Sequence, residues 1–147
     1  MFASDAEALA AAEKAYAAYL KVSDEVAQGG GHDADRLIGL AAGNLLTDDR
    51  SGFQTFVAKG WRSVGSTKLT NIELQSADLK AGPGTPAAVV TYLCEDVSGV
   101  DVLDASGASV VSPQRPNEQQ FQVTFDLSAS KLIPSEREPW AASGICK

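Results

Sequence analysis

The chain has 147 residues, the size of one ordinary domain, and a chain of this length buries roughly 70% of its unfolded surface. Hydrophobic residues make up 44% and charged residues 21%, close to the average of soluble globular proteins, which excludes intrinsic disorder and fibrous repeats. The formal net charge is −7, and an acidic surface repels phosphate backbones, so we expect no nucleic-acid partner.

The chain contains no stretch near the roughly 18 consecutive apolar residues of a membrane helix, and no signal-peptide pattern at its start. We therefore expect no transmembrane segment. The hydrophobic spacing changes from helical to strand-like near Trp61. This predicts a single domain over residues 1–147, with a helical part at 4–60 and a sheet part at 61–147.

A long first helix is the clearest local prediction. Ser4 and Glu7 fit a capping box, so the helix should begin at Asp5. Apolar residues then recur every three or four positions, which indicates one buried stripe. The three glycines at 29–31 should end this helix.

Two shorter helices are predicted to follow. Asp33 or Asp35 can cap the second, which Gly43 should stop, and Thr47 can cap the third, which should end before Gly60. The buried face of the third helix is predicted to carry Phe53, Phe56 and Val57.

The sheet part begins with a long strand over 66–79, whose alternation slips between Leu69 and Ile72, as a β-bulge would cause. The run 87–94 is apolar on both faces, which is typical of a central strand. A hairpin with Gly107 in its turn should follow.

Two later segments complete the predicted antiparallel sheet. The segment 120–127 alternates apolar and polar residues, so one face should meet the core and the other water. The last segment, 131–140, contains Pro134 and Pro139, which cannot donate to a ladder and so suit an edge.

The cysteines bear on the cellular compartment. Cys94 lies in the apolar central strand and Cys146 is the penultimate residue, so a disulfide between them would hold a terminus that otherwise frays. This pairing is our hypothesis, and it implies an oxidising compartment. The alternative is two unrelated buried thiols.

A long capped helix, two shorter helices and a bent antiparallel sheet together resemble the nuclear transport factor 2-like, cystatin-like cone. The runs 2–20, 64–67, 97–104 and 144–146 are also similar to a group of small secreted actinobacterial proteins. The resemblance implies an α+β fold with three N-terminal helices packed on the sheet. It also implies a location outside the cell or in its envelope, in the mature part of a lipoprotein. The group implies no activity, and the wider superfamily holds enzymes and plain scaffolds alike.

Few residues are suited to catalysis or metal binding. His32, the only histidine, follows three glycines in a predicted loop, too mobile for an oriented base. The two cysteines are far apart, so we expect no metal site and no cofactor. Candidates for acid–base chemistry are the strand carboxylates and the tyrosines: Glu73, Asp78, Glu95, Asp96, Tyr16, Tyr19 and Tyr92.

We therefore expect a non-catalytic binding or interaction module outside the cytoplasm, whose partner is a small apolar ligand or a protein. The predicted pocket lining consists of Tyr16, Tyr19, Phe53, Trp61 and Tyr92. The alternative is an isomerase- or cyclase-like enzyme that uses a pocket carboxylate. A further alternative is a homodimer through the outer sheet face around Gln120, Gln122 and Thr124.

Overall fold

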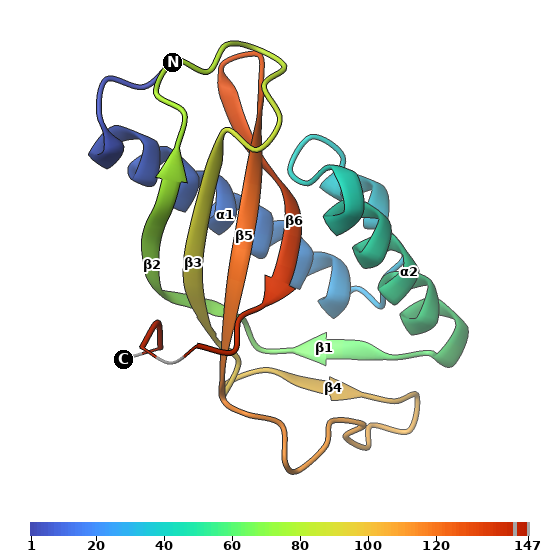
Figure 1. The fold of residues 1–147 in the computed structure, drawn as a ribbon. Helices are drawn as coiled ribbons and strands as arrows, with labels where there is room; N and C mark the ends of the chain where they lie inside the picture. Colours follow the sequence, from blue (N-terminus) through green and yellow to red (C-terminus); the bar gives the residue numbers. More distant parts are fainter. Residues whose placement is uncertain (143, 147) are drawn as a thin grey trace.

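The computed structural model describes residues 1–142 and 144–146. Over this part of the chain, two α-helices and one 3₁₀ turn precede six strands, which confirms the α+β class (Figure 1). The helical elements are α1 (Asp5–Gln28), η1 (Ala34–Leu37) and α2 (Gly43–Lys59). The strands are β1 (Arg62–Val64), β2 (Lys68–Ala77), β3 (Val89–Asp96), β4 (Asp101–Leu103), β5 (Glu118–Ser128) and β6 (Lys131–Pro139).

Helix α1 forms as the capping pattern predicts. The Ser4 hydroxyl accepts a hydrogen bond from the Glu7 N–H at 3.2 Å, and the Glu7 carboxylate accepts one from the Ala3 N–H at 3.2 Å. The helix ends at Gln28, directly before the glycine run. It crosses one face of the sheet diagonally (Figure 1). Neither α1 nor any other described helix has the length and apolar character needed to cross a bilayer.

The prediction of three helices is wrong, because the second one is only a four-residue 3₁₀ turn, η1. Ile38 already has an extended backbone, and Gly39 has φ +88°, a left-handed conformation that a helix cannot continue through. Leu37 and Ala41 are nevertheless buried, as expected of an apolar segment that packs without being helical.

The start predicted for the third helix is also wrong. Helix α2 begins at Gly43, the residue expected to stop the helix before it, and Thr47 lies inside α2, where its hydroxyl donates to the Gly43 carbonyl at 3.2 Å. Phe53 is buried as predicted, whereas Val57 is 44% exposed. The polar residues near Thr47 are thus helix-interior residues rather than caps.

The four strands β2, β3, β5 and β6 form an antiparallel sheet in the order β2-β3-β5-β6. Strand β3 is central and β6 lies at one edge, as predicted. The pairing of β2 with β3 shifts between Leu69 and Asn71, which confirms the predicted bulge, and shifts again between Leu74 and Ser76. Bulges bend a sheet. The closed cone of the resembling family stays a prediction.

The predicted hairpin exists only in part. Its turn is present, with Gly107 at φ +88° and its N–H donating to the Asp104 carbonyl at 3.0 Å. Beyond the turn, however, Leu103 and Ser109 make a single bridge. Strand β4 pairs instead with β1, which forms a small second sheet. Sequence spacing favoured the nearest partner for β4, but in the folded chain β4 pairs with β1, the strand that directly follows α2.

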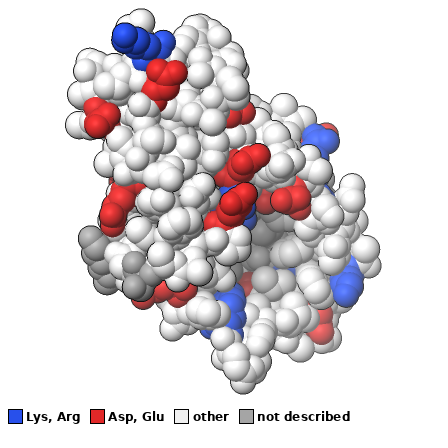
Figure 2. Space-filling model, in the orientation of Figure 1, with Lys and Arg blue, Asp and Glu red and all other residues white. Residues whose placement is uncertain are grey.

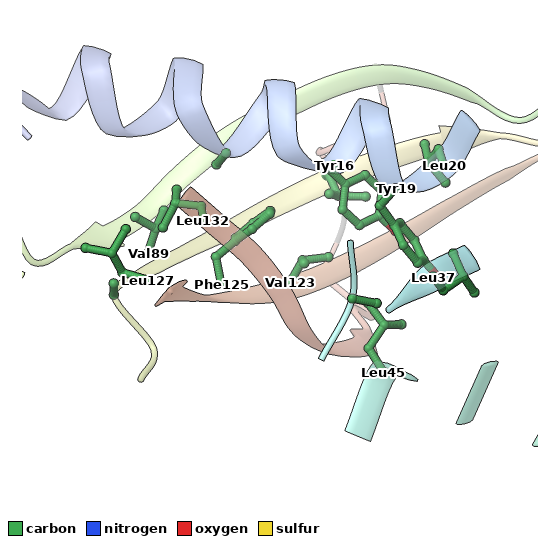
Figure 3. Close-up of a cluster of buried hydrophobic side chains, with 14 of the residues drawn as sticks. Tyr16, Tyr19, Leu20, Leu37, Leu45, Val89, Val123, Phe125, Leu127 and Leu132 are labelled. Atoms are coloured by element: carbon green, nitrogen blue, oxygen red, sulfur yellow. The ribbon is translucent and has the colours of Figure 1, made fainter. Parts of the chain in front are cut away.

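The hydrophobic core lies between α1, α2 and the inner face of the four-stranded sheet (Figure 3). Alternate residues of β3 and β5 supply the sheet side of this core, as the alternation of β5 predicted. The labelled aliphatic and aromatic members are Leu20, Leu37, Leu45, Val89, Val123, Phe125, Leu127 and Leu132, together with Tyr16 and Tyr19.

Replacing Gly65 by alanine should destabilise the junction between the two sheets by about 2 kcal/mol. Gly65 has φ +83°, and a Cβ added there would lie 1.8 Å from the Gly99 carbonyl oxygen. The loops after β1 and β3 therefore could not approach as they do. Urea unfolding measures the effect, and Gly82→Ala is the matched control because nothing lies within 4 Å of a Cβ at Gly82. Equal losses in both variants would contradict this explanation.

Candidate functional site

Five polar side chains meet inside the fold, and we call them the tyrosine–carboxylate cluster: Tyr16 and Tyr19 from α1, Asp49 from α2, Glu95 from β3 and Arg137 from β6. The Tyr16 hydroxyl donates to the Glu95 carboxylate. The Tyr19 hydroxyl donates to Asp49 Oδ2 at 2.5 Å. Arg137 Nη1 donates to the Tyr16 hydroxyl at 3.2 Å and lies 3.5 Å from Glu95 Oε2. The cluster thus joins both helices to two strands.

Water has almost no access to the centre of the cluster. Tyr16 is 0%, Tyr19 1% and Glu95 4% exposed. The two tyrosine rings lie 5.3 Å apart, and the Tyr16 ring meets Phe125 edge-on at 6.3 Å. Arg137 reaches the cluster from the side, with its guanidinium over the Phe121 ring at 4.9 Å. The polar groups are therefore enclosed by aromatic packing.

Burial is the main cause of the pKa shifts of the carboxyls and tyrosines in the cluster. It raises the pKa of Glu95, and the nearby Arg137 charge and the Tyr16 hydrogen bond offset this rise only in part. Burial likewise raises the pKa of Asp49 against the effect of the Tyr19 hydrogen bond. The tyrosine pKa values are raised by burial and by the facing carboxylates, so both tyrosines stay neutral donors.

The raised carboxyl pKa values predict a specific pH dependence. A carboxyl whose pKa is higher in the folded than in the unfolded chain contributes stability that is complete below its unfolded pKa. That stability is lost as pH rises through the folded pKa. Relative to a Glu95→Gln variant, the wild type should therefore lose about 1 kcal/mol of unfolding free energy between pH 4 and pH 8. Urea unfolding across this range measures the difference, and a difference of opposite slope would show that the Arg137 charge outweighs burial.

The predicted pocket lining is not brought together into one pocket. Tyr16 and Tyr19 belong to the cluster. Phe53 packs edge-on against Phe56, and Phe56 against Trp61, on the helical side. Tyr92 packs against Trp140 at 4.6 Å, and strand alternation places Tyr92 on the outer face of the sheet. Among the predicted carboxylates, Glu95 alone joins the cluster.

The main hollows of the described surface lie elsewhere. Five hollows are lined by residues of α1, of the start of α2, and of the strands and loops of the four-stranded sheet, and none of these linings includes a member of the cluster. The centre of the fold is filled by side chains. Tyr16 and Glu95 are 0% and 4% exposed, so a ligand could reach this pair only if the groups packed around it moved.

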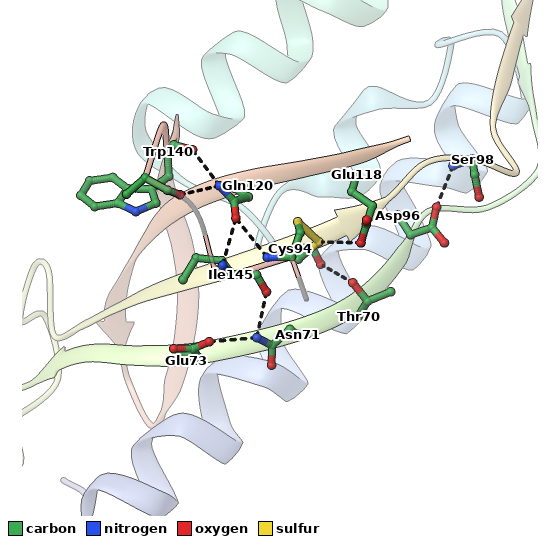
Figure 4. Close-up of a disulfide and its surroundings, with 12 residues drawn as sticks. Thr70, Asn71, Glu73, Cys94, Asp96, Ser98, Glu118, Gln120, Trp140 and Ile145 are labelled. Carbon is green, nitrogen blue, oxygen red and sulfur yellow. Dashed lines mark hydrogen bonds between the residues drawn. A yellow bond between two sulfur atoms is a disulfide. The ribbon is translucent and has the colours of Figure 1, made fainter. Parts of the chain in front are cut away.

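Cys94 and Cys146 form a disulfide, which confirms the predicted pairing (Figure 4). Residues 140–142 and 144–146, which we call the C-terminal strap, lie on the outer face of the sheet, where they contact Gln120 and Cys94. The Gln120 side chain accepts from the N–H groups of Ile145 and Cys146 at 2.9 and 3.0 Å, and donates to the Ala142 carbonyl at 2.6 Å. The disulfide sulfurs carry no thiolate, so this site is not suited to a metal ion.

The outer sheet face beyond the strap is acidic. Glu73, Tyr92, Gln122 and Glu138 form one cross-strand row, and Glu136 is paired with Thr124 beside it. Carboxylate side chains lie across the middle of this face in Figure 2. Two copies that met through it would bring like charges together, which opposes a symmetric dimer. The homodimer stays a prediction, and the strap already occupies Gln120.

Two members of the cluster, Asp49 and Arg137, were not predicted from the sequence. Asp49 stands two residues after Thr47, the predicted cap, where helix-dipole stabilisation would explain an acidic residue without any tertiary partner. Arg137 stands between Glu136 and Glu138, a charge run typical of an exposed edge strand. Arg137 faces inward because it pairs in the ladder with the buried Val123, a register that only the structure shows.

Comparisons with known proteins identify a fold but no family. No family model matches the chain, and no curated protein matches it. Among solved structures, the chain is similar to the crystal structure of the intermembrane space region of the chloroplast protein ARC6. The TM-score is 0.63 and the sequence identity 16%, over 91% of this chain and 97% of that chain. At this identity the likeness shows a shared fold and nothing about activity.

Proposed function

We propose that this chain is a non-catalytic binding or interaction module that works outside the cytoplasm. The observation that carries the proposal is the closed centre of the fold. Its tyrosines and carboxylates are bonded to one another and are almost inaccessible, so they stabilise the packing of helices on the sheet. An acid–base catalyst has to reach the proton that it transfers, and this cluster offers no such access.

Two observations support the compartment in this proposal. The disulfide between Cys94 and Cys146 is of a kind that persists in oxidising environments and is rare in the cytosol. The fold is also that of a protein region described as lying in an intermembrane space. Under this proposal the chain is the mature part of a cell-envelope lipoprotein, as its resemblance to small secreted actinobacterial proteins implies.

An isomerase- or cyclase-like enzyme is the second candidate. The observation that favours it is a buried carboxyl with a raised pKa, Glu95, directly bonded to the Tyr16 hydroxyl. Such a pair could transfer protons if α1 opened. The same pair is equally well explained as a structural hydrogen bond in the core, because the Tyr16 hydroxyl and the Glu95 carboxylate each give the other a hydrogen-bond partner.

Native mass spectrometry of the unreduced chain, incubated with a small-molecule extract of bacterial envelopes, separates the two candidates. For an interaction module we expect the mass of the oxidised chain with no bound small molecule. A one-to-one adduct that disappears in the Tyr16→Phe variant would contradict the closed centre on which the non-catalytic assignment rests, and would favour the enzyme. Titration of the unfolded chain without reductant should find no free thiol; free thiols there would contradict the extracytoplasmic assignment.

A further inference from the structure

We propose that the free edge of β2, together with the adjoining flank of α1, binds an extended segment of another protein as an added strand. This inference rests on the proposed interaction role and names its site and the kind of partner. Strand β2 pairs with β3 on one side, and no described strand lies on its other side. Its outward N–H and C=O groups can be paired by an extended backbone.

The two edge strands of the sheet, β2 and β6, differ in how well they are shielded from pairing with another strand. Edge strand β6 contains Pro134 and Pro139, which have no N–H to offer, and the Ala42 N–H before α2 donates to the Pro134 carbonyl at 3.0 Å. Strand β2 contains no proline from Lys68 to Ala77. Between its two bulges, the stretch Asn71–Leu74 pairs regularly with β3 and can present a regular ladder outward.

The core is also incomplete at the β2 edge. Leu93 of β3 and Val123 of β5 are fully buried against the helices. The inward residues of β2, Leu69, Ile72 and Leu74, are only partly buried, although they pack on the same core. At the other edge, α2 packs against β6 and completes the core. An added strand beside β2 would bury the remaining apolar surface of these three side chains.

A groove between α1 and β2 marks where this strand would lie. One hollow of about 380 Å³ is lined by Ala17, Leu20, Lys21, Asp24, Glu25, Gln28, Ser66, Thr67 and Leu69. A second, of about 240 Å³, is lined by Glu13, Leu69, Thr70, Asn71 and Ile72. The two hollows share Leu69. Their α1 residues include Glu13, Ala17, Leu20 and Asp24, spaced three or four apart and therefore on one helix flank.

The groove defines the chemistry of the occupant. Apolar residues at alternate positions would pack on Leu20, Leu69 and Ile72, and the exposed carboxylate of Glu13 favours a lysine or arginine beside them, whereas Glu25 is already paired with Arg36. The N-terminal half of α1 extends past β2 (Figure 1). A second copy of this chain would bring its own α1 into that space, whereas a single extended segment would not.

The test uses the full oxidised chain and a phage-displayed library of random linear dodecapeptides. We expect enriched peptides in which apolar residues alternate with basic or polar ones. Methylation of their alternate backbone nitrogens should weaken binding about tenfold or more, because those N–H groups pair with β2. Ala17→Arg fills the groove and should weaken binding to the same extent. Ala18→Arg is the matched control, because Ala18 is exposed on α1 and does not line the groove.

Three results would overturn the inference. They are a selection without enrichment, equal binding by the Ala17→Arg and Ala18→Arg variants, and a chain that sediments alone as a dimer which Ala17→Arg dissociates. The last result would assign the edge to a second copy. None of them bears on the small-molecule and thiol measurements, so failure here is distinguishable from failure of the proposed function.

Discussion

Replacing Arg137 by methionine should lower the free energy of unfolding by about 3 kcal/mol at pH 7. The substitution keeps the apolar stem but removes the charge that lies 3.5 Å from the buried Glu95 carboxylate. It leaves that carboxylate with the Tyr16 hydroxyl as its remaining partner in the cluster. An uncompensated buried charge is costly, and the pKa of Glu95 should rise further. Urea unfolding at pH 7 measures the loss, which should shrink at pH 5.

Two further variants separate this explanation from a general effect of removing arginine. Arg36→Met breaks the pair with Glu25, whose side chains are 48% and 39% exposed, and should cost less than about 1 kcal/mol. The double variant Arg137→Met/Glu95→Gln should recover most of the stability, because no unpaired charge remains at position 95. Equal losses for the Arg36 and Arg137 variants would show that the cluster makes no special contribution.

Opening the disulfide should cost about 4 kcal/mol, because the bond closes a loop between residues 52 positions apart and restricts the unfolded chain. The Cys146→Ala variant leaves Cys94 as a buried thiol and should unfold at the same urea concentration as the reduced wild type. The oxidised wild type should be more stable than both. Unchanged stability on reduction would mean that the contacts of Gln120 alone hold the C-terminal strap.

Reduction of the disulfide should also change which part of the structure unfolds locally. The strap is held to the outer sheet face by the disulfide, by Gln120 and by the Asn71 side chain, which donates to the Ile145 carbonyl at 2.9 Å. Without the bond, amides of the strap should exchange hydrogen faster while those of β3 keep their protection. Equal acceleration in β3 would indicate that the bond stabilises the whole sheet rather than the strap.

Local patterns were sufficient for much of the fold. The capping box of α1, the alternation in β5, the apolar run of β3 and the prolines of β6 each predicted an element correctly, because each depends on residues adjacent in sequence. The second helix failed for the opposite reason. The apolar residues around Leu37 can be buried whether or not the segment is helical, so their spacing does not specify a helix. The left-handed backbone of Gly39 alone is enough to stop one.

By itself, the sequence determined the α+β class, the order of helices before strands and the cysteine pair that ties the C-terminal segment to β3. Tertiary structure decided which polar residues meet. Tyr16 and Arg137 lie at opposite ends of the chain, and no local spacing relates them. It also decided that Tyr16, Tyr19 and Glu95 are enclosed and that no strand of the described part of the chain pairs with the outer edge of β2. Cavities and unpaired edges depend on how elements pack across the sheet, which is not encoded in any one segment.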